Sequence, residues 1–502
     1  MSASVNSILH ATQGNPLLEA LEPYLSTNDL EQRLHNWPLA GVDVANLSTT
    51  ARHDFLDLMQ EQLFEPTLTS LDTTTRLYRM IRRGCIARDP TQTSTRAHLM
   101  AVARFAGREL REVPWFQHSA KCMRVSGVTG LGKTYEILRA LTQLPPKFEH
   151  GYSRSADWTH MTQVAWLYVG MSHDGSLGGL LLQILVELDK CAGTSYSRER
   201  SLTGLSNEKL AVQVGIVLNN HAVGVLVIDE LQGRNFAGGA RGGLAATFFL
   251  RILNFGIPLV LMGNPIGMDA LDSFSQDMRR VGSSGNIEMH PLGKEDYDYT
   301  DMLAPALWRY NVMPRPSEVE DKDGSILFRY CGGIRSYGAR MRVASQRLAL
   351  DQGNQAVTEE HMKQAFMGPD FSERDRQLIA GFRDHNPLLL QDFDDVPWQR
   401  YAQRWGYYAS DTEHELEQPA ACDGPATSNT TTKRRKPVAQ QSAEAAQRRQ
   451  TRSKNKDAKK QQAKTALDEN DMRNNGLQDH LITGIELLQK QEGSTTNNRK
   501  GI

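Results

Sequence analysis

The stretch Gly127-Val128-Thr129-Gly130-Leu131-Gly132-Lys133-Thr134 fits the pattern G-x-x-x-x-G-K-[ST] and decides the fold class. Its glycines let the backbone turn so that N–H groups and the positive end of the following helix face an anion. Lys133 is predicted to neutralise the β- and γ-phosphates of a nucleotide, and Thr134 to hold Mg²⁺ through its hydroxyl. The stretch predicts a site for ATP and Mg²⁺ made by Gly127, Val128, Thr129, Gly130, Leu131, Gly132, Lys133, Thr134 and Tyr135.

The segments around this loop have the secondary structure that the motif requires. Residues 123–126 are predicted to be a short strand, and residues 135–141 continue as a helix that ends before Pro145. A chain of this length shows the bare pattern by accident in roughly two of a hundred cases, so a second motif is needed to support it.

A second motif follows about a hundred residues later, where the apolar run 224–228 is typical of a buried strand and ends in Asp229-Glu230. In a nucleotide hydrolase, Asp229 would hold Mg²⁺ through its ligand shell, and Glu230 would polarise the attacking water. A solvated acidic turn is the alternative. The phosphate loop upstream favours the catalytic interpretation.

A third apolar run, residues 257–263, ends at Asn264. Because parallel strands deliver their last residues to one edge of a sheet, Asn264 is predicted to lie between the γ-phosphate and the water positioned by Glu230. An ordinary turn residue in Gly-Asn-Pro is the alternative.

Three arginines complete the predicted catalytic set. Arg279 and Arg280 end a polar helix and are candidates for reaching the γ-phosphate of a neighbouring subunit, although cations are also favourable at a helix C-terminus. Arg335 follows Gly332-Gly333 in the first turn of a long helix, where the dipole disfavours a cation, so it needs another partner such as phosphate.

The order of these motifs resembles the AAA+ ATPases. Within them, Val-Ile-Asp-Glu-Leu-Gln at 227–232 and Gly-Ile-Pro-Leu-Val-Leu-Met-Gly-Asn-Pro at 256–265 resemble the TnsC/TniB family, the ATP-dependent regulators of target-selecting DNA transposons. The likeness covers about residues 15–385. It implies an α/β fold: a P-loop AAA+ core of three layers around a parallel sheet, with a helical lid. The pattern of the N-terminal residues adds a helical N-terminal extension, and composition adds a disordered basic C-terminal tail.

This resemblance also implies partners and an activity. The family members are ATPases that assemble as homo-oligomers, in a ring or a helical filament, on double-stranded DNA without sequence preference, and that link a target-selector protein to the transposase subunits. Two alternatives stay open. The first is an AAA+ helicase loader or replication initiator, and the second is a nucleotide-gated scaffold that does not bind DNA.

Composition agrees with a cytoplasmic bacterial protein of several domains. The 502 residues contain no run near the ~18 apolar residues of a membrane span, and no secretory signal is expected. The five cysteines are scattered without a Cys-x-x-Cys pair, so neither a disulfide framework nor a zinc site is predicted.

Charge is distributed unevenly along the chain. Residues 433–464 carry twelve Lys or Arg against two acidic residues, although the net charge of the whole chain is −1. Such a stretch cannot bury a core, so we expect a disordered arm that tethers nucleic acid or a partner, or a solvated linker. Beyond it, Leu477, Leu481, Ile485 and Leu488 recur at helical spacing, as in a partner-binding helix or one that packs on the body.

We therefore divide the chain into five predicted regions: a helical N-terminal extension (1–105), the nucleotide-binding core (106–293), a helical lid (294–385), an aromatic and acidic connector (386–418) and the basic tail (419–502). In the connector, Trp398, Tyr401 and Trp405 share a helical face, which favours packing over base stacking. Asp392, Asp394 and Asp395 are interpreted as a solvated acidic loop, with a metal cluster as the alternative.

DNA contacts are expected in two Gly-rich loops after strand ends, 170–179 and 233–243. Ordinary flexible connections are an equal alternative for both loops. The basic stretch between Arg76 and Arg88 could bind DNA or a partner, and an exposed helix face is the favoured interpretation.

Overall fold

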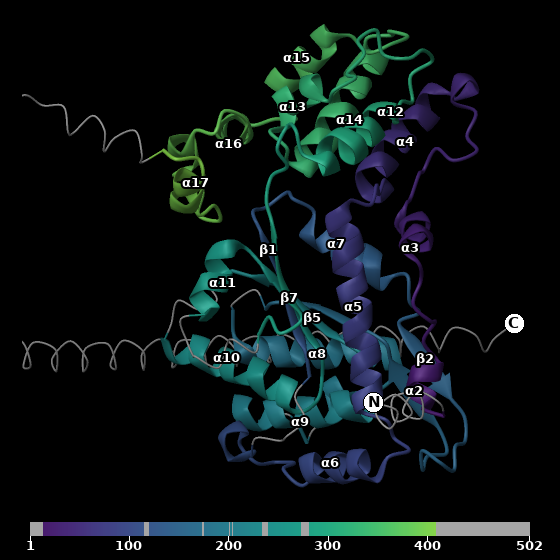
Figure 1. Cartoon of the computed structure of the whole chain (residues 1–502), viewed down its shortest axis with the longest axis vertical. Helices are drawn as coiled ribbons and strands as arrows, with labels where there is room; N and C mark the ends of the chain where they lie inside the picture. Colours follow the sequence, from purple (N-terminus) through teal and green to yellow (C-terminus); the bar gives the residue numbers. More distant parts are fainter. Residues whose placement is uncertain are drawn as a thin grey trace, which may run out of the picture. The chain divides into compact units, whose positions relative to one another are not determined.

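The computed structural model describes residues 14–114, 120–172, 175–199, 201–202, 204–232, 239–272 and 281–407, without the side chains of 239–242. A five-stranded parallel sheet lies at the centre, in the order β4-β5-β6-β1-β7 (Figure 1). Its strands are β1 (Cys122–Gly127), β4 (Leu167–Gly170), β5 (Leu226–Leu231), β6 (Leu259–Gly263) and β7 (Gly285–Met289). Two further strands, β2 (Lys147–His150) and β3 (Met161–Val164), form an antiparallel pair.

Helices cover both faces of the sheet, because alternate strand residues point to opposite sides. In β5, Leu226 and Ile228 belong to a core shared with α8, α9 and α10, whereas Val227 belongs to one shared with α5 and α7. These helices are α5 (Leu68–Ala87), α7 (Lys133–Leu141), α8 (Leu177–Ala192), α9 (Asn207–Asn220) and α10 (Gly239–Asn254). The predicted three-layer α/β fold is confirmed.

A helical region follows the sheet. It consists of the π-helix η6 (Asp298–Leu303), α12 (Ala304–Arg309), α13 (Ser325–Cys331), α14 (Arg335–Asp351), α15 (Glu359–Met367), α16 (Glu373–Arg383), the 3₁₀ helix η7 (Pro387–Leu390) and α17 (Trp398–Arg404). The start of this region is irregular: the π-helix η6 continues directly into α12, and Pro305, which cannot donate a backbone hydrogen bond, lies in the first turn of α12.

The remaining helices are α2 (Pro16–Glu19), α3 (Thr27–Leu34), α4 (Thr49–Gln62), α6 (Thr93–Ala103) and α11 (Pro265–Asp272), with short 3₁₀ turns at Val44–Asn46, Leu110–Glu112 and Tyr196–Arg198. The N-terminal helices contact two different parts of the fold: α5 covers the sheet beside α7, and α4 packs on the helical region beside α14 (Figure 1). Arg347 of α14 donates to Asp57 of α4 over 2.9 Å.

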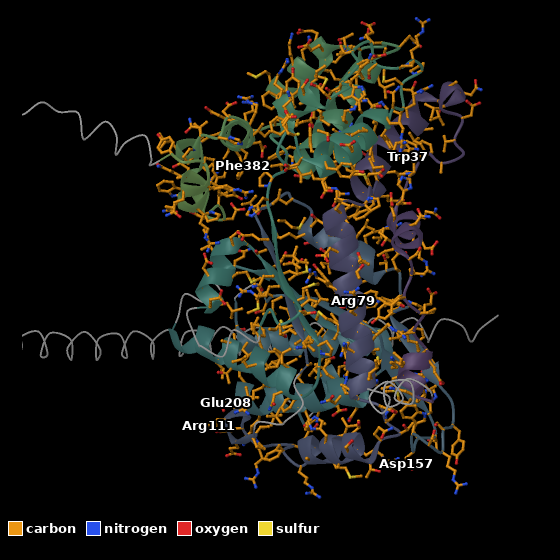
Figure 2. The ribbon with its side chains drawn as sticks, in the orientation of Figure 1. Trp37, Arg79, Arg111, Asp157, Glu208 and Phe382 are labelled. Carbon is orange, nitrogen blue, oxygen red and sulfur yellow. The ribbon has the colours of Figure 1, made fainter. Side chains whose placement is uncertain are left out.

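Several local predictions can be compared directly with the structure. Thr358 caps α15, and its hydroxyl accepts from the N–H of His361. Trp398, Tyr401 and Trp405 pack in the core of the helical region. The ring centroids of Tyr401 and of Phe382, which is labelled in Figure 2, lie 5.0 Å apart. The loop expected over 170–179 is shorter, because α8 already begins at Leu177 with a cap from Ser176.

The four cysteines in the described ranges, Cys85, Cys122, Cys191 and Cys331, are free thiols. Among the helices that the structure describes, none has both the length and the apolar character of a membrane span. The predicted basic tail and its terminal helix at 477–488 lie outside the described residues.

Candidate nucleotide-binding site

The loop between β1 and α7 has the backbone that its glycines allow. Gly130 and Gly132 have φ angles of 90° and 93°, in the left-handed region that side chains disfavour. Gly132 is also the N-cap of α7, with no side-chain cap. The N–H groups at the start of α7 are therefore available to an anion at the carboxyl edge of the sheet.

Lys133 folds back over this loop. Its Nζ donates to the carbonyl oxygens of Gly127 and Val128 over 2.7 and 3.0 Å. Burial lowers the pKa of Lys133, and the nearby carboxylates of Asp229 and Asp395 oppose that shift. The ammonium group is thus held in place by main-chain acceptors beside two negative charges.

Asp229 is held by three donors at the end of β5. Its Oδ2 accepts from the hydroxyl of Thr134 at 2.6 Å and from that of Tyr168 at 2.5 Å, and its Oδ1 accepts from the N–H of Glu230 at 2.6 Å. Burial, followed by the bond to Asp229, raises the pKa of Tyr168. Thr134 and Asp229, the predicted Mg²⁺ residues, therefore lie together and present the oxygen ligands that this ion prefers.

Glu230 projects from an irregular point in the sheet. The register between β5 and β6 shifts between Ile228 and Leu231, and Glu230 within this bulge has a φ angle of 62°. A bulge re-aims the side chain that it carries. Glu230 is exposed, and its Oε2 lies 3.7 Å from where a Cβ on Gly170 would be.

Asn264 follows β6, which lies between β1 and β5 in the sheet. Its Oδ1 accepts from the N–H of Gly267 at 2.7 Å, as expected of a residue that caps α11. Asn264 also lines the same cavity as Lys133 and Glu230. The structure therefore shows the turn role and leaves the catalytic role of Asn264 as a prediction.

One cavity of about 950 Å³ joins these groups. The predicted residues that line it are Thr129, Gly130, Gly132, Lys133, Thr134, Tyr135, Asp229, Glu230, Asn264 and Arg335.

Arg335, the first residue of α14, has a carboxylate partner in the protein. Its Nη1 donates to Oε1 of Glu136 at 2.6 Å, and its guanidinium lies 4.8 Å from the ring centroid of Phe64. Burial raises the pKa of Glu136, and the charge of Arg335 counteracts this. This ion pair joins α7, which follows the phosphate loop, to α14, which follows Gly332-Gly333. A phosphate contact by Arg335 stays a prediction.

Two other predicted residues, Arg279 and Arg280, lie outside the described residues. Among the described ranges, no group of three or more His, Cys, Asp or Glu side chains could hold a metal ion.

The connector reaches the phosphate loop, and the interpretation of its acidic residues as merely solvated is wrong for Asp395. Its Oδ2 accepts from the backbone N–H of Thr129 at 3.0 Å. Arg374 of α16 lines the same cavity and donates to the carbonyl of Asp392 at 2.6 Å. A carboxylate thus uses one of the loop N–H groups that would otherwise face phosphate oxygens.

Comparison with known proteins agrees with this geometry. Residues 117–271 match the family described as AAA domain. Together with the parallel sheet and the phosphate loop, this match defines the central part of the chain as an AAA domain of the AAA+ fold. No curated protein matches the chain in sequence.

Similar solved structures include three origin-recognition proteins. The ORC2 protein of Aeropyrum pernix in its ADPNP–ADP complexes has 11% identity and a TM-score of 0.35, covering 64% of this chain and 86% of that one. Drosophila ORC bound to DNA has 12% identity and a TM-score of 0.33, and the match covers 82% of this chain and 87% of that one. The A. pernix ORC1 protein in complex with DNA has 17% identity and a TM-score of 0.32, and the match covers 65% of this chain and 79% of that one.

Proposed function

We propose that the protein binds ATP in the cavity at the carboxyl edge of the sheet and hydrolyses it. The observation that carries this proposal is the bond between Thr134 and Asp229 beside Lys133, since it brings both halves of a P-loop site together. Lys133 and the N–H groups of the loop bind the phosphates, and Thr134 and Asp229 would hold Mg²⁺, which supplies charge neutralisation at the phosphates when bound. Glu230 orients a water molecule and accepts its proton.

Two substitutions test this assignment. Lys133→Ala should lose ATP affinity, because the loop contains no other cation. Glu230→Gln should keep ATP binding but lower turnover by about a hundredfold or more, because the amide is nearly isosteric and a poor base. Glu208→Gln, which changes a half-buried carboxylate on α9 outside the cavity, is the control and should leave both properties unchanged. Normal turnover by Glu230→Gln would sink the assignment of the base.

We further propose that the protein regulates DNA transposition. In this role the ATP-bound form assembles on duplex DNA and links a target selector to the transposase. The resemblance of residues 227–232 and 256–265 to the TnsC/TniB family supports this role, and the AAA domain is consistent with it. Arg279 and Arg280 remain the candidates for acting on a neighbouring nucleotide, a role that requires an oligomer.

Electron microscopy of the purified protein tests this second step. With ATP and duplex DNA we expect rings or filaments on the DNA, and with ADP we expect none. Pull-down of the cognate transposase in the ATP state distinguishes a transposition regulator from a helicase loader, which should retain a replicative helicase instead. A nucleotide-dependent assembly that forms equally without DNA would indicate a scaffold and contradict DNA binding.

A further inference from the structure

A second cavity, of about 340 Å³, lies at the other edge of the sheet, where strands β1 and β6 begin. Lys121, just before β1, and Pro258, just before β6, contribute to its wall. Other lining residues come from the end of α5 and the start of α6. The nucleotide loop follows the opposite end of β1, so the two cavities are separate.

Arg88, which follows α5 and lines this cavity, carries a buried charge with no counter-ion. It is 6% exposed, and its Nε and Nη2 donate to the carbonyls of Gly84 and Val223 over 3.2 and 2.7 Å. Its Nη1 is itself buried and has no hydrogen-bond partner, and none of the ion pairs in the described residues joins Arg88 to a carboxylate. Since a guanidinium stays charged in proteins, such a group calls for an anion.

The other charges around the cavity have the same sign. Arg83 and Lys121 are exposed and form no ion pair within the described ranges, and no Asp or Glu there lines the cavity. Asp89, next to Arg88 in the chain, is engaged elsewhere, because its carboxylate accepts from Thr91 and Gln92. The wall is therefore positively charged without local compensation.

Backbone donors complete the site. Helix α6 begins after Gln92, which provides no side-chain cap, and Ser94 and Thr95 of its first turn line the cavity. Uncapped N–H groups and the positive end of the helix dipole favour an anion there. The dipole at the end of α5 favours Arg83, but it explains neither the unpaired Nη1 of Arg88 nor the uncapped α6.

We propose that this cavity binds a phosphate group, either of a nucleic-acid backbone or of a small phosphorylated ligand. The start of α6 forms the base of the site with the buried positive charge of Arg88 behind it, and Arg83 and Lys121 supply charge at its exposed rim. Guanidinium, ammonium and helix N–H groups are the donors that proteins use for phosphate. The site is independent of the proposed ATPase function.

The test compares two full-length proteins, each with two arginine or lysine substitutions in addition to a shared Lys133→Ala. Arg83→Gln with Lys121→Gln alters the cavity rim. Arg79→Gln with Arg104→Gln alters two exposed arginines outside the cavity, one on α5 (Figure 2) and one at the end of α6. Both also carry Lys133→Ala, which weakens binding at the nucleotide loop.

Titration calorimetry with inorganic pyrophosphate at fixed ionic strength gives the readout. We expect the control to bind and the cavity variant to bind about tenfold more weakly or worse, since two charged contacts are lost. Equal affinities, or no binding by either protein, would overturn the proposal. Thermal unfolding of both should be unchanged, because the substituted side chains are exposed.

Duplex DNA is the second probe. If the cavity variant also binds DNA more weakly than the control, with a shallower dependence on salt, the phosphate belongs to a nucleic-acid backbone. If DNA binding is equal while pyrophosphate affinity falls, the ligand is a small phosphate compound.

Discussion

Removing the carboxylate of Asp395 should increase the affinity for ATP. In the structure this carboxylate accepts the N–H of Thr129 at 3.0 Å, in the loop that would receive the phosphates. A nucleotide has to displace it, so the free energy of this contact opposes binding. Hydrogen bonds to charged groups contribute about 1.5–3 kcal/mol, and solvent exposure of this one argues for roughly 1 kcal/mol, equivalent to about fivefold in affinity.

Equilibrium binding of a fluorescent ATP analogue measures this effect in wild type, Asp395→Ala and Asp394→Ala. Asp394 lines the same cavity and is the matched control, because no hydrogen bond joins it to the loop in the described residues. We expect a gain of about fivefold for Asp395→Ala and a smaller one for Asp394→Ala. Unchanged or weaker binding by Asp395→Ala would refute the reasoning, and equal gains would show that general charge, not the contact, opposes the nucleotide.

Three further outcomes are expected. ATP affinity should fall as the pH rises toward the pKa of Lys133, because only the ammonium form attracts phosphate. Burial lowers this pKa, so the fall should occur at a lower pH than for an ordinary lysine. The affinity of a Lys133→Arg protein should depend less on pH from pH 7 to 10. Glu136→Ala should lower the free energy of unfolding in urea by about 3–5 kcal/mol, because it leaves the charge of Arg335 without its partner. A loss under about 1 kcal/mol would contradict a structural role for this ion pair. Truncation after Tyr408 should preserve ATP-dependent DNA binding but abolish transposase recruitment, and the reverse result would mean that the roles of core and tail are exchanged.

The sheet and the centre of the nucleotide site could be predicted because their signals are local. The loop residues follow a short predicted strand, Asp229 and Glu230 follow an apolar run, and parallel strands bring such residues to one edge. Asn264 was placed in the same way. No knowledge of distant contacts was needed for these residues.

The contacts that sequence patterns could not show join distant segments. Asp395 meets Thr129 across 266 positions, and Arg335 meets Glu136 across 199. Glu136 had no signal of its own, because a glutamate in the first turn of a helix is favourable for any surface helix. The role of Tyr168 was also missed, although its strand ends beside the acidic one and a polar side chain there would have been a reasonable candidate.

The backbone of Glu230 implies a conflict between folding and activity. A left-handed conformation costs a residue other than glycine about 1–2 kcal/mol, and the bulge of β5 imposes it at the one position predicted to carry the base. Glycine would fit the same bulge without that strain, yet it has no carboxylate. If Glu230 is the proposed base, selection for stability alone would favour glycine at position 230 and remove the base, so selection for turnover would have to keep the glutamate.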